Sequence, residues 1–212
     1  MAKTKVKICG ITSLGDALTA CDYGADALGF ILYDRSPRYI NPGQVAQIIR
    51  RLPVFVSTVG VFVDASIDTI RSIVAATGLD YVQLHGNEPL DMVHELGTKA
   101  IKAFRIKDAS SIREVNASGL RIVLLDSATS RYGGSGRSFD HALLQGLSPD
   151  IRYILSGGIT PDNVCELVNT FNPEAIDVSS GVETAPGRKS GDKMKLLFGR
   201  LNGCTVHGTG KI

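Results

Sequence analysis

The chain has 212 residues, 43% hydrophobic and 21% charged, which is the composition of an ordinary globular domain. Its formal net charge of +2 includes no block of basic residues, which argues against nucleic acid or an anionic membrane surface as the partner. No run is apolar for long enough to cross a bilayer, and the first five residues resemble neither a secretory signal nor a transit segment.

Short β-branched or aliphatic runs alternate with longer amphipathic stretches along the chain. The short runs predict strands at Lys5–Ile8, Ala27–Ile31, Ser57–Val63, Tyr81–Leu84, Ala100–Arg105, Arg121–Leu125, Tyr153–Ser156 and Ala175–Val178. The longer stretches predict helices at Ser13–Tyr23, Pro42–Arg51, Ile67–Thr77, Pro89–Leu96, Ala109–Val115, Asp140–Gln145, Pro161–Thr170 and Asp192–Leu201. Asn41 before Pro42 and Thr160 before Pro161 mark helix starts, because proline fits the first turn.

This order of elements predicts a single-domain α/β fold, the (β/α)8 TIM barrel, over residues 1–201. A doubly wound open sheet alternates in the same way, so the periodicity alone leaves both architectures open. The last residues, 202–212, contain three glycines and show no period, and we expect them to form an irregular tail.

Strand parity indicates which side chains face the barrel axis. In the first strand Lys7 and Cys9 share one face, while the apolar residues between and before them share the other. The same alternation places Gln83 with His85, and it places Asp126 and Asp177 on inward faces. Polar side chains therefore converge at the carboxyl ends of the strands, where barrels of this kind carry their active sites.

Two glycine-containing turns follow the seventh and eighth predicted strands. The first contains Gly157, Gly158 and Ile159, and the second contains Ser179, Ser180 and Gly181. Glycines let the backbone approach a ligand, and exposed amide groups beside a helix start suit a phosphate. Glycines can also serve only to turn the chain, but the pair of loops favours a phosphorylated small-molecule substrate.

Seven short motifs occur in a characteristic order: KICGIT at 7–12, SPRY at 36–39, QLHG at 83–86, LDS at 125–127, GGSG at 133–136, LSGGI at 155–159 and DVSSGVE at 177–183. Together they resemble the phosphoribosylanthranilate isomerase family of tryptophan biosynthesis, from Lys5 to about Leu201. The resemblance implies a (β/α)8 barrel. It also implies an Amadori rearrangement of N-(5′-phosphoribosyl)anthranilate to 1-(2-carboxyphenylamino)-1-deoxyribulose 5-phosphate, which needs one acid and one base but no metal or cofactor.

The resemblance also assigns roles to single residues. Cys9 matches the general base that removes the C2′ proton, and Asp126 matches the general acid that protonates the furanose oxygen. A free thiol has a pKa of about 8.5, so we expect Lys7 on the same strand face to favour the thiolate. Asp126 must hold a proton at neutral pH to serve as an acid. A buried filler and a helix cap are the structural alternatives for these two residues.

Arg38 matches the residue that clamps the anthranilate carboxylate, since a planar guanidinium suits a planar carboxylate. His85 and Asp177 match further positions of the substrate site. The stretch Gly133–Gly136 is expected to be a loop that closes over the substrate. After Pro186-Gly187 the chain departs from the family pattern, which leaves the start of the last helix open.

Four cysteines lie far apart without a Cys-x-x-Cys pair, which argues against a zinc site and against disulfides, and favours a reducing cytoplasm. Oligomeric state cannot be read from the sequence, which shows no long apolar stripe.

Another phosphosugar isomerase or epimerase on the same barrel is the nearest alternative function. A sister isomerase of histidine biosynthesis would carry aspartate where this chain has Cys9. A non-catalytic barrel that binds a phosphorylated ligand would be expected to lack the acid or the base. A domain cut from a larger fused enzyme is a further alternative.

Overall fold

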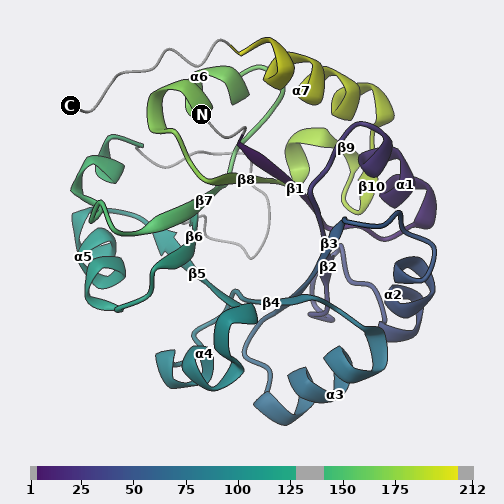
Figure 1. Cartoon of the computed structure of the whole chain (residues 1–212), viewed down its shortest axis with the longest axis horizontal. Coiled ribbons are helices and arrows are strands. Elements are labelled where there is room, and N and C mark those ends of the chain that lie inside the picture. The colour runs from purple at the N-terminus through teal and green to yellow at the C-terminus, as the bar shows by residue number, and fades with distance from the viewer. Residues whose placement is uncertain (1–3, 128–140, 205–212) are drawn as a thin grey trace.

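A computed structural model describes residues 4–127 and 141–204 of the chain. Eight parallel strands pair in sequence order, and β8 pairs with β1 to close a barrel surrounded by helices (Figure 1). The strands are β1 (Lys5–Cys9), β2 (Ala27–Ile31), β3 (Ser57–Phe62), β4 (Tyr81–Leu84), β5 (Ala100–Ile106), β6 (Ile122–Ser127), β7 (Arg152–Ser156) and β8 (Ala175–Val178). The TIM barrel predicted from the sequence is confirmed, and the open sheet is excluded.

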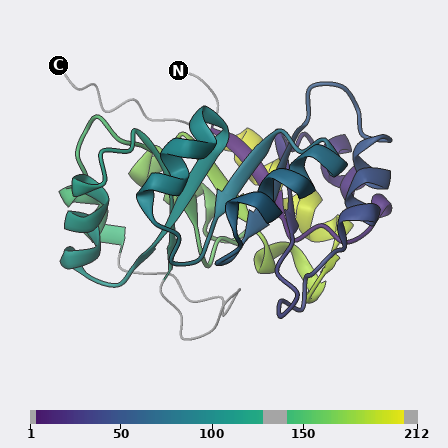
Figure 2. The ribbon, with the colours of Figure 1, turned by 90° about the horizontal axis from the view of Figure 1, so that it is seen from below.

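The helices run alongside the barrel strands when the molecule is seen from the side (Figure 2). They are α1 (Leu14–Asp22), α2 (Pro42–Ile49), α3 (Ile67–Thr77), α4 (Leu90–Leu96), α5 (Ala109–Ala117), α6 (Val164–Phe171) and α7 (Gly191–Gly203). Short 3₁₀ turns lie at η1 (Gly97–Lys99), η2 (His141–Gly146) and η3 (Ser180–Val182), and a small hairpin joins β9 (Glu183–Ala185) to β10 (Arg188–Lys189). The helix predicted at 140–145 is therefore a 3₁₀ turn where it is described. No helix within the described ranges is long and apolar enough to span a bilayer.

Side-chain caps explain where most helices begin. Asn41 accepts a hydrogen bond from the backbone N–H of Gln44 and places Pro42 in the first turn of α2, as the sequence predicts. Ser190 caps α7 in the same way by accepting from the N–H of Lys193. This cap settles the start of the last helix, which the sequence left open.

Four predicted helix boundaries were wrong by two or three residues: the ends of α2, α5 and α7, and the start of α6. Regular α6 begins at Val164 rather than Pro161, because the Asn163 side chain closes a separate turn by bonding both the carbonyl of Gly158 and the N–H of Thr160. At the other end, α7 continues to Gly203, so the first two residues of the expected tail are helical. Residues 205–212 lie outside the described part of the chain.

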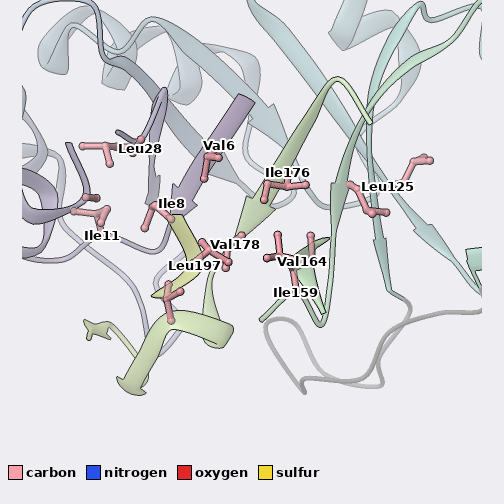
Figure 3. Packing of buried hydrophobic residues seen from close by; sticks show 14 of the residues in the cluster. Val6, Ile8, Ile11, Leu28, Leu125, Ile159, Val164, Ile176, Val178 and Leu197 are labelled. Atoms are coloured by element: carbon pink, nitrogen blue, oxygen red, sulfur yellow. The ribbon is translucent and has the colours of Figure 1, made fainter. Parts of the chain in front are cut away.

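The main hydrophobic core fills the space between the barrel wall and the helices. Ile8 on β1 and Val178 on β8 pack with Leu197 of α7 in one buried cluster (Figure 3). The barrel interior is lined by the opposite strand faces, where Val61 pairs in register with Gln83. Period-two alternation thus sends apolar residues outward to the helices and leaves polar ones such as Lys7 on the axis.

A disulfide joins Cys165 on α6 to Cys204 at the end of α7, and this corrects the expectation that no disulfide forms. The two cysteines are 39 residues apart in sequence and are brought together because α6 and α7 pack side by side. Spacing along the chain gives no signal for such a tertiary contact. Cys9 and Cys21 carry free thiols.

Candidate active site

Cys9 lies at the carboxyl end of β1, on the inward face that strand parity predicts, and its side chain is buried. The neighbouring strand β2 contributes Gly29, which pairs in register with Cys9. A Cβ atom at Gly29 would lie 2.7 Å from the Cys9 sulfur and 3.0 Å from the Lys7 side chain. The thiol and the Lys7 stem therefore occupy space that only glycine leaves open.

Lys7 forms the centre of a buried polar network across the barrel. Its ammonium donates to Asp177 Oδ1 on β8 at 2.9 Å and to Gln83 Oε1 on β4 at 2.8 Å. Burial by itself lowers the pKa of Lys7, but the Asp177 carboxylate and Cys9 outweigh it, so the pKa stands above its ordinary value. Lys7 is therefore a cation with an anionic partner inside the barrel.

The network continues from Gln83 to the predicted acid. The amide nitrogen of Gln83 lies 2.7 Å from His85 Nδ1, and His85 Nε2 lies 3.1 Å from Asp126 Oδ2. About a fifth of each of the His85 and Asp126 side chains is exposed, so both border solvent at the open end of the barrel. The structure thus links three sequence-predicted site residues, Asp177, His85 and Asp126, through Lys7 and Gln83.

The pKa of the Cys9 thiol is raised above its ordinary value, which differs from the sequence-based expectation. Burial raises it most, the Asp177 carboxylate raises it further, and the lowering effects of Lys7 and Lys189 are smaller. The expected direction of the Lys7 effect is correct, but its charge is shared with Asp177 and does not overcome burial. The surroundings of Cys9 therefore favour its neutral thiol form.

Arg38 is buried and forms a two-pronged ion pair with Glu183. Its Nε lies 2.9 Å from Oε1, and its Nη2 lies 2.7 Å from Oε2. Lys189 also donates to Glu183 Oε1 and reaches the backbone carbonyl of Cys9. The pKa of Glu183 falls below its ordinary value, because the hydrogen bonds and charges of Arg38 and Lys189 outweigh burial, which alone would raise it. This arrangement ties the segments after β2 and β8 to the end of β1.

The two glycine turns are in direct contact. A Cβ atom at Gly181 would lie 1.9 Å from the carbonyl oxygen of Ile159, so the backbones touch where no larger residue fits. Gly157 and Gly158 both have positive φ angles, of 91° and 68°, which favour glycine. Within the described ranges, Ser179 Oγ is buried and has no hydrogen-bond partner. The structure therefore brings together the residues predicted to bind phosphate.

The stretch Gly133–Gly136, expected to close over the substrate, lies outside the described residues.

A second buried ion pair holds the segment that carries His85 in place. Lys102 on β5 donates to Glu88 and to the carbonyl of Gly86, and Glu88 accepts from the N–H groups of Gly86 and Asp64. This pair fixes the turn that follows β4.

The sequence from residue 6 to residue 200 matches the protein family described as N-(5′phosphoribosyl)anthranilate (PRA) isomerase. The chain belongs to this family. It is an isomerase of tryptophan biosynthesis, as the motifs predicted.

Relatives and solved structures agree with this membership. The N-(5′-phosphoribosyl)anthranilate isomerase of Geobacter sulfurreducens is 45% identical over 200 residues, covering 94% of this chain and 98% of the relative. The crystal structure of the Thermotoga maritima PRA isomerase superposes with a TM-score of 0.89 at 40% identity, covering 94% of this chain and 99% of that one. A PRA isomerase in complex with reduced 1-(o-carboxyphenylamino)-1-deoxyribulose 5-phosphate has a TM-score of 0.83 at 36% identity, with coverage of 94% and 99%.

Sequence reasoning missed several residues that shape the candidate site. Glu183 ends the DVSSGVE motif, but nothing local predicts that it pairs with Arg38, 145 residues away in sequence, or that Lys189 shares its carboxylate. Gly29 was not singled out, although a glycine inside a strand is a known sign of close approach. Asn163, which bonds both ends of the turn at 158–160, was read only as part of a helix.

Proposed function

We propose that this member of the PRA isomerase family converts N-(5′-phosphoribosyl)anthranilate to 1-(2-carboxyphenylamino)-1-deoxyribulose 5-phosphate with Cys9 as the general base and Asp126 as the general acid. The observation that carries the proposal is the hydrogen-bonded chain that runs from Asp177 through Lys7, Gln83 and His85 to Asp126. It holds the acid at the open end of the same barrel in which Cys9 ends β1.

The reaction needs two proton transfers and no change in overall oxidation state. A proton from Asp126 to the furanose oxygen breaks the C1′–O bond and leaves an iminium at C1′. Removal of the C2′ proton by Cys9 then gives an enolamine, which becomes the ketone of the product. Each positioned proton transfer contributes about 10²–10⁴-fold to a rate, so the loss of either group is expected to be severe.

Cys9 must ionise before it can take the C2′ proton. Burial and the Asp177 carboxylate oppose its ionisation, whereas the ammonium groups of Lys7 and Lys189 favour it. The base is therefore poised by two cations that the fold fixes within reach of the thiol. The thiolate is a better base when the pKa of its thiol is not too low, because it then has a higher affinity for the C2′ proton.

We place the substrate phosphate at the paired glycine turns. The support is the backbone contact between Gly181 and Ile159, the positive φ angles of Gly157 and Gly158, and the buried Ser179 hydroxyl, which has no hydrogen-bond partner in the described part of the chain. Backbone amide groups and a hydroxyl are the donors that phosphate oxygens accept from.

Arg38 is proposed to meet the anthranilate carboxylate. In the described structure its Nε and Nη2 donate to Glu183, so the carboxylate would be met by Nη1 or would compete with Glu183. Guanidinium groups favour paired, planar contacts to carboxylates, and Glu183 already shows such a contact at this side chain. We also propose that His85 and Asp177 belong to the substrate site, because the hydrogen-bonded chain through Lys7 and Gln83 connects both of them to Asp126.

Turnover of freshly generated phosphoribosylanthranilate, followed by its fluorescence, tests the proposal. Wild type is expected to consume the substrate, while Cys9→Ser and Asp126→Asn are each expected to lower kcat by at least about 100-fold. Cys21→Ser and Asp22→Asn on α1 make the same chemical changes away from the site and should leave turnover unaltered. Full activity in either site variant would overturn its assigned role.

A folded wild type without turnover would favour the second candidate, another phosphosugar isomerisation on the same barrel.

A cytoplasmic location is also proposed. A catalytic thiol at Cys9 calls for reducing surroundings, although the Cys165–Cys204 bond forms only where an oxidant is present. Cell fractionation with thiol trapping distinguishes the two conditions.

A further inference from the structure

We propose that Gln83 is a positioning residue that fixes the tautomer of His85 and thereby keeps Asp126 able to hold the proton that opens the sugar ring. The inference rests on the proposed role of Asp126. It concerns the two residues that lie between the Lys7 cation and the acid, neither of which has a proton-transfer role in the reaction above.

The orientation of the Gln83 amide follows from Lys7. An ammonium can only donate hydrogen bonds, so the group of Gln83 that lies 2.8 Å from Lys7 Nζ must be the carbonyl oxygen. Lys7 pairs with Asp177, and both side chains are about 5% exposed, so the ammonium that orients Gln83 is buried with its anionic partner. The NH₂ group of Gln83 then faces His85.

The tautomer of His85 follows from Gln83 in turn. The amide nitrogen can only donate, and it lies 2.7 Å from His85 Nδ1, so Nδ1 must accept and can carry no proton. The ring proton of the neutral imidazole is therefore on Nε2, which lies 3.1 Å from Asp126 Oδ2 and donates to it. The hydrogen bonds thus all point one way across the barrel, from Lys7 through Gln83 and His85 to Asp126.

This direction decides the charge that Asp126 faces. A histidine beside a carboxylate tends to become an imidazolium, which would stabilise Asp126 as a carboxylate and weaken its hold on a proton. Protonation of His85 at Nδ1 would set a new N–H against the Gln83 N–H donor and break the 2.7 Å bond. Gln83 therefore disfavours the imidazolium form of His85, and with it an added positive charge beside Asp126.

The other charged groups around His85 are consistent with this role. Arg105 on β5 donates to the backbone carbonyl of His85 at 3.3 Å and pairs in register with Asp126 on β6. Lys7 and Asp177 act on the ring through Gln83, and Glu88 accepts from the N–H of the next residue, Gly86. Among the residues that the structure describes, Gln83 contacts Nδ1 and Asp126 contacts Nε2.

Gln83→Glu is the sharpest test because it keeps the size and the Lys7 contact while replacing the donor with an acceptor. A carboxylate at this position accepts a proton-bearing Nδ1, so His85 is expected to become doubly protonated. Ring nitrogen NMR shifts report this directly in the ligand-free protein, and a His85→Asn variant assigns the signal. Wild type is expected to show the neutral form with the proton on Nε2.

The kinetic arm separates positioning from simple damage. In Gln83→Glu, kcat is expected to fall at least about 10-fold at neutral pH with a smaller change in KM, and the alkaline limb of the kcat profile should move to lower pH. A purely structural loss would lower kcat at every pH. Gln145→Glu, an exposed position on η2, adds the same charge elsewhere and should leave both readouts unaltered.

Three outcomes would overturn the inference: a wild-type ring with its proton on Nδ1, a ring that stays neutral in Gln83→Glu, or a changed ring charge with unchanged kcat. If Gln83→Glu fails to fold, the wild-type NMR spectrum and a Gln83→Met variant, which removes the donor without adding charge, still decide the tautomer. The NMR arm needs no substrate, so its failure is distinguishable from failure of the assigned reaction.

Discussion

Arg38 and Glu183 form a buried ion pair through two guanidinium nitrogens, with both side chains about 5% exposed. Lys189 shares the same carboxylate. One anion therefore compensates two buried cations, and it connects the loop after β2 with the hairpin that follows β8. Buried pairs of this kind are strongly destabilised when a single partner is removed, because the remaining charge keeps its desolvation cost.

Glu183→Gln is accordingly expected to lower the free energy of unfolding by about 3 kcal/mol, since Arg38 and Lys189 lose their shared anion. Urea denaturation at pH 7 measures the change. Glu174→Gln removes the exposed carboxylate partner of Arg152 and should cost under about 1 kcal/mol. Equal effects of the two substitutions would contradict the buried pair as a source of stability.

The same pair predicts a dependence on pH. Arg38 and Lys189 hold the pKa of Glu183 below its ordinary value in the folded protein, against the raising effect of burial. Its stabilisation is thus fully present above the unfolded-state value of about 4.3 and is lost as the pH falls through the folded value. The difference in unfolding free energy between wild type and Glu183→Gln should shrink below about pH 4. A constant difference in acid would count against the assignment.

Titration of Cys9 provides a further test, because two neighbouring charged residues shift the pKa of its thiol in opposite directions. Asp177 raises the pKa of the Cys9 thiol and Lys189 lowers it, with burial as the largest cause of the overall rise. Asp177→Asn should therefore move the midpoint of Cys9 alkylation to lower pH, and Lys189→Met should move it to higher pH. Mass spectrometry of the labelled peptides separates Cys9 from the other free thiol, Cys21. Shifts in the same direction would show that access, not charge, controls the reaction.

Local patterns predicted the barrel and the inward faces, but not the partners within it. Period two in the strands is enough to place Lys7, Gln83 and Asp177 on the axis. That Lys7 bonds both of the others depends on barrel closure, which brings β1, β4 and β8 together across 76 and 170 residues of sequence. The expectation that Cys9 favours the thiolate failed for the same reason, because burial and the nearby charge of Asp177 arise only from the tertiary structure. The early start assigned to α6 reflects the separate turn that the Asn163 side chain closes, which composition does not reveal.

Gly181 offers a test of the phosphate site that leaves the acid and base intact. A methyl group at this position would meet the Ile159 carbonyl oxygen at 1.9 Å, so Gly181→Ala must push the two glycine turns apart. We expect KM for the phosphorylated substrate to rise at least about 10-fold, consistent with the loss of one or two hydrogen bonds to a charged group.

Gly199→Ala on α7 is the matched control, because a Cβ atom there meets nothing within 4 Å. It should leave KM unchanged and add about 0.5–1 kcal/mol of stability, as expected for glycine replaced inside a helix. A wild-type KM in Gly181→Ala would remove the contact between the turns from the phosphate site.

The Cys165–Cys204 disulfide predicts a stability that depends on reductant. The bond closes a loop with a sequence separation of 39 and fastens the end of α7 to α6. Loop closure of this length stabilises a fold by about 4 kcal/mol in the chain-entropy account, although native-state effects reduce the realised gain. Cys165→Ser should therefore unfold at lower urea concentration than wild type under oxidising conditions and at nearly the same concentration in dithiothreitol. Cys21→Ser removes a free thiol on α1, so its difference from wild type should be the same with and without reductant. A wild-type midpoint that does not respond to dithiothreitol, together with four titratable thiols in the unfolded oxidised protein, would show that the bond does not form in solution.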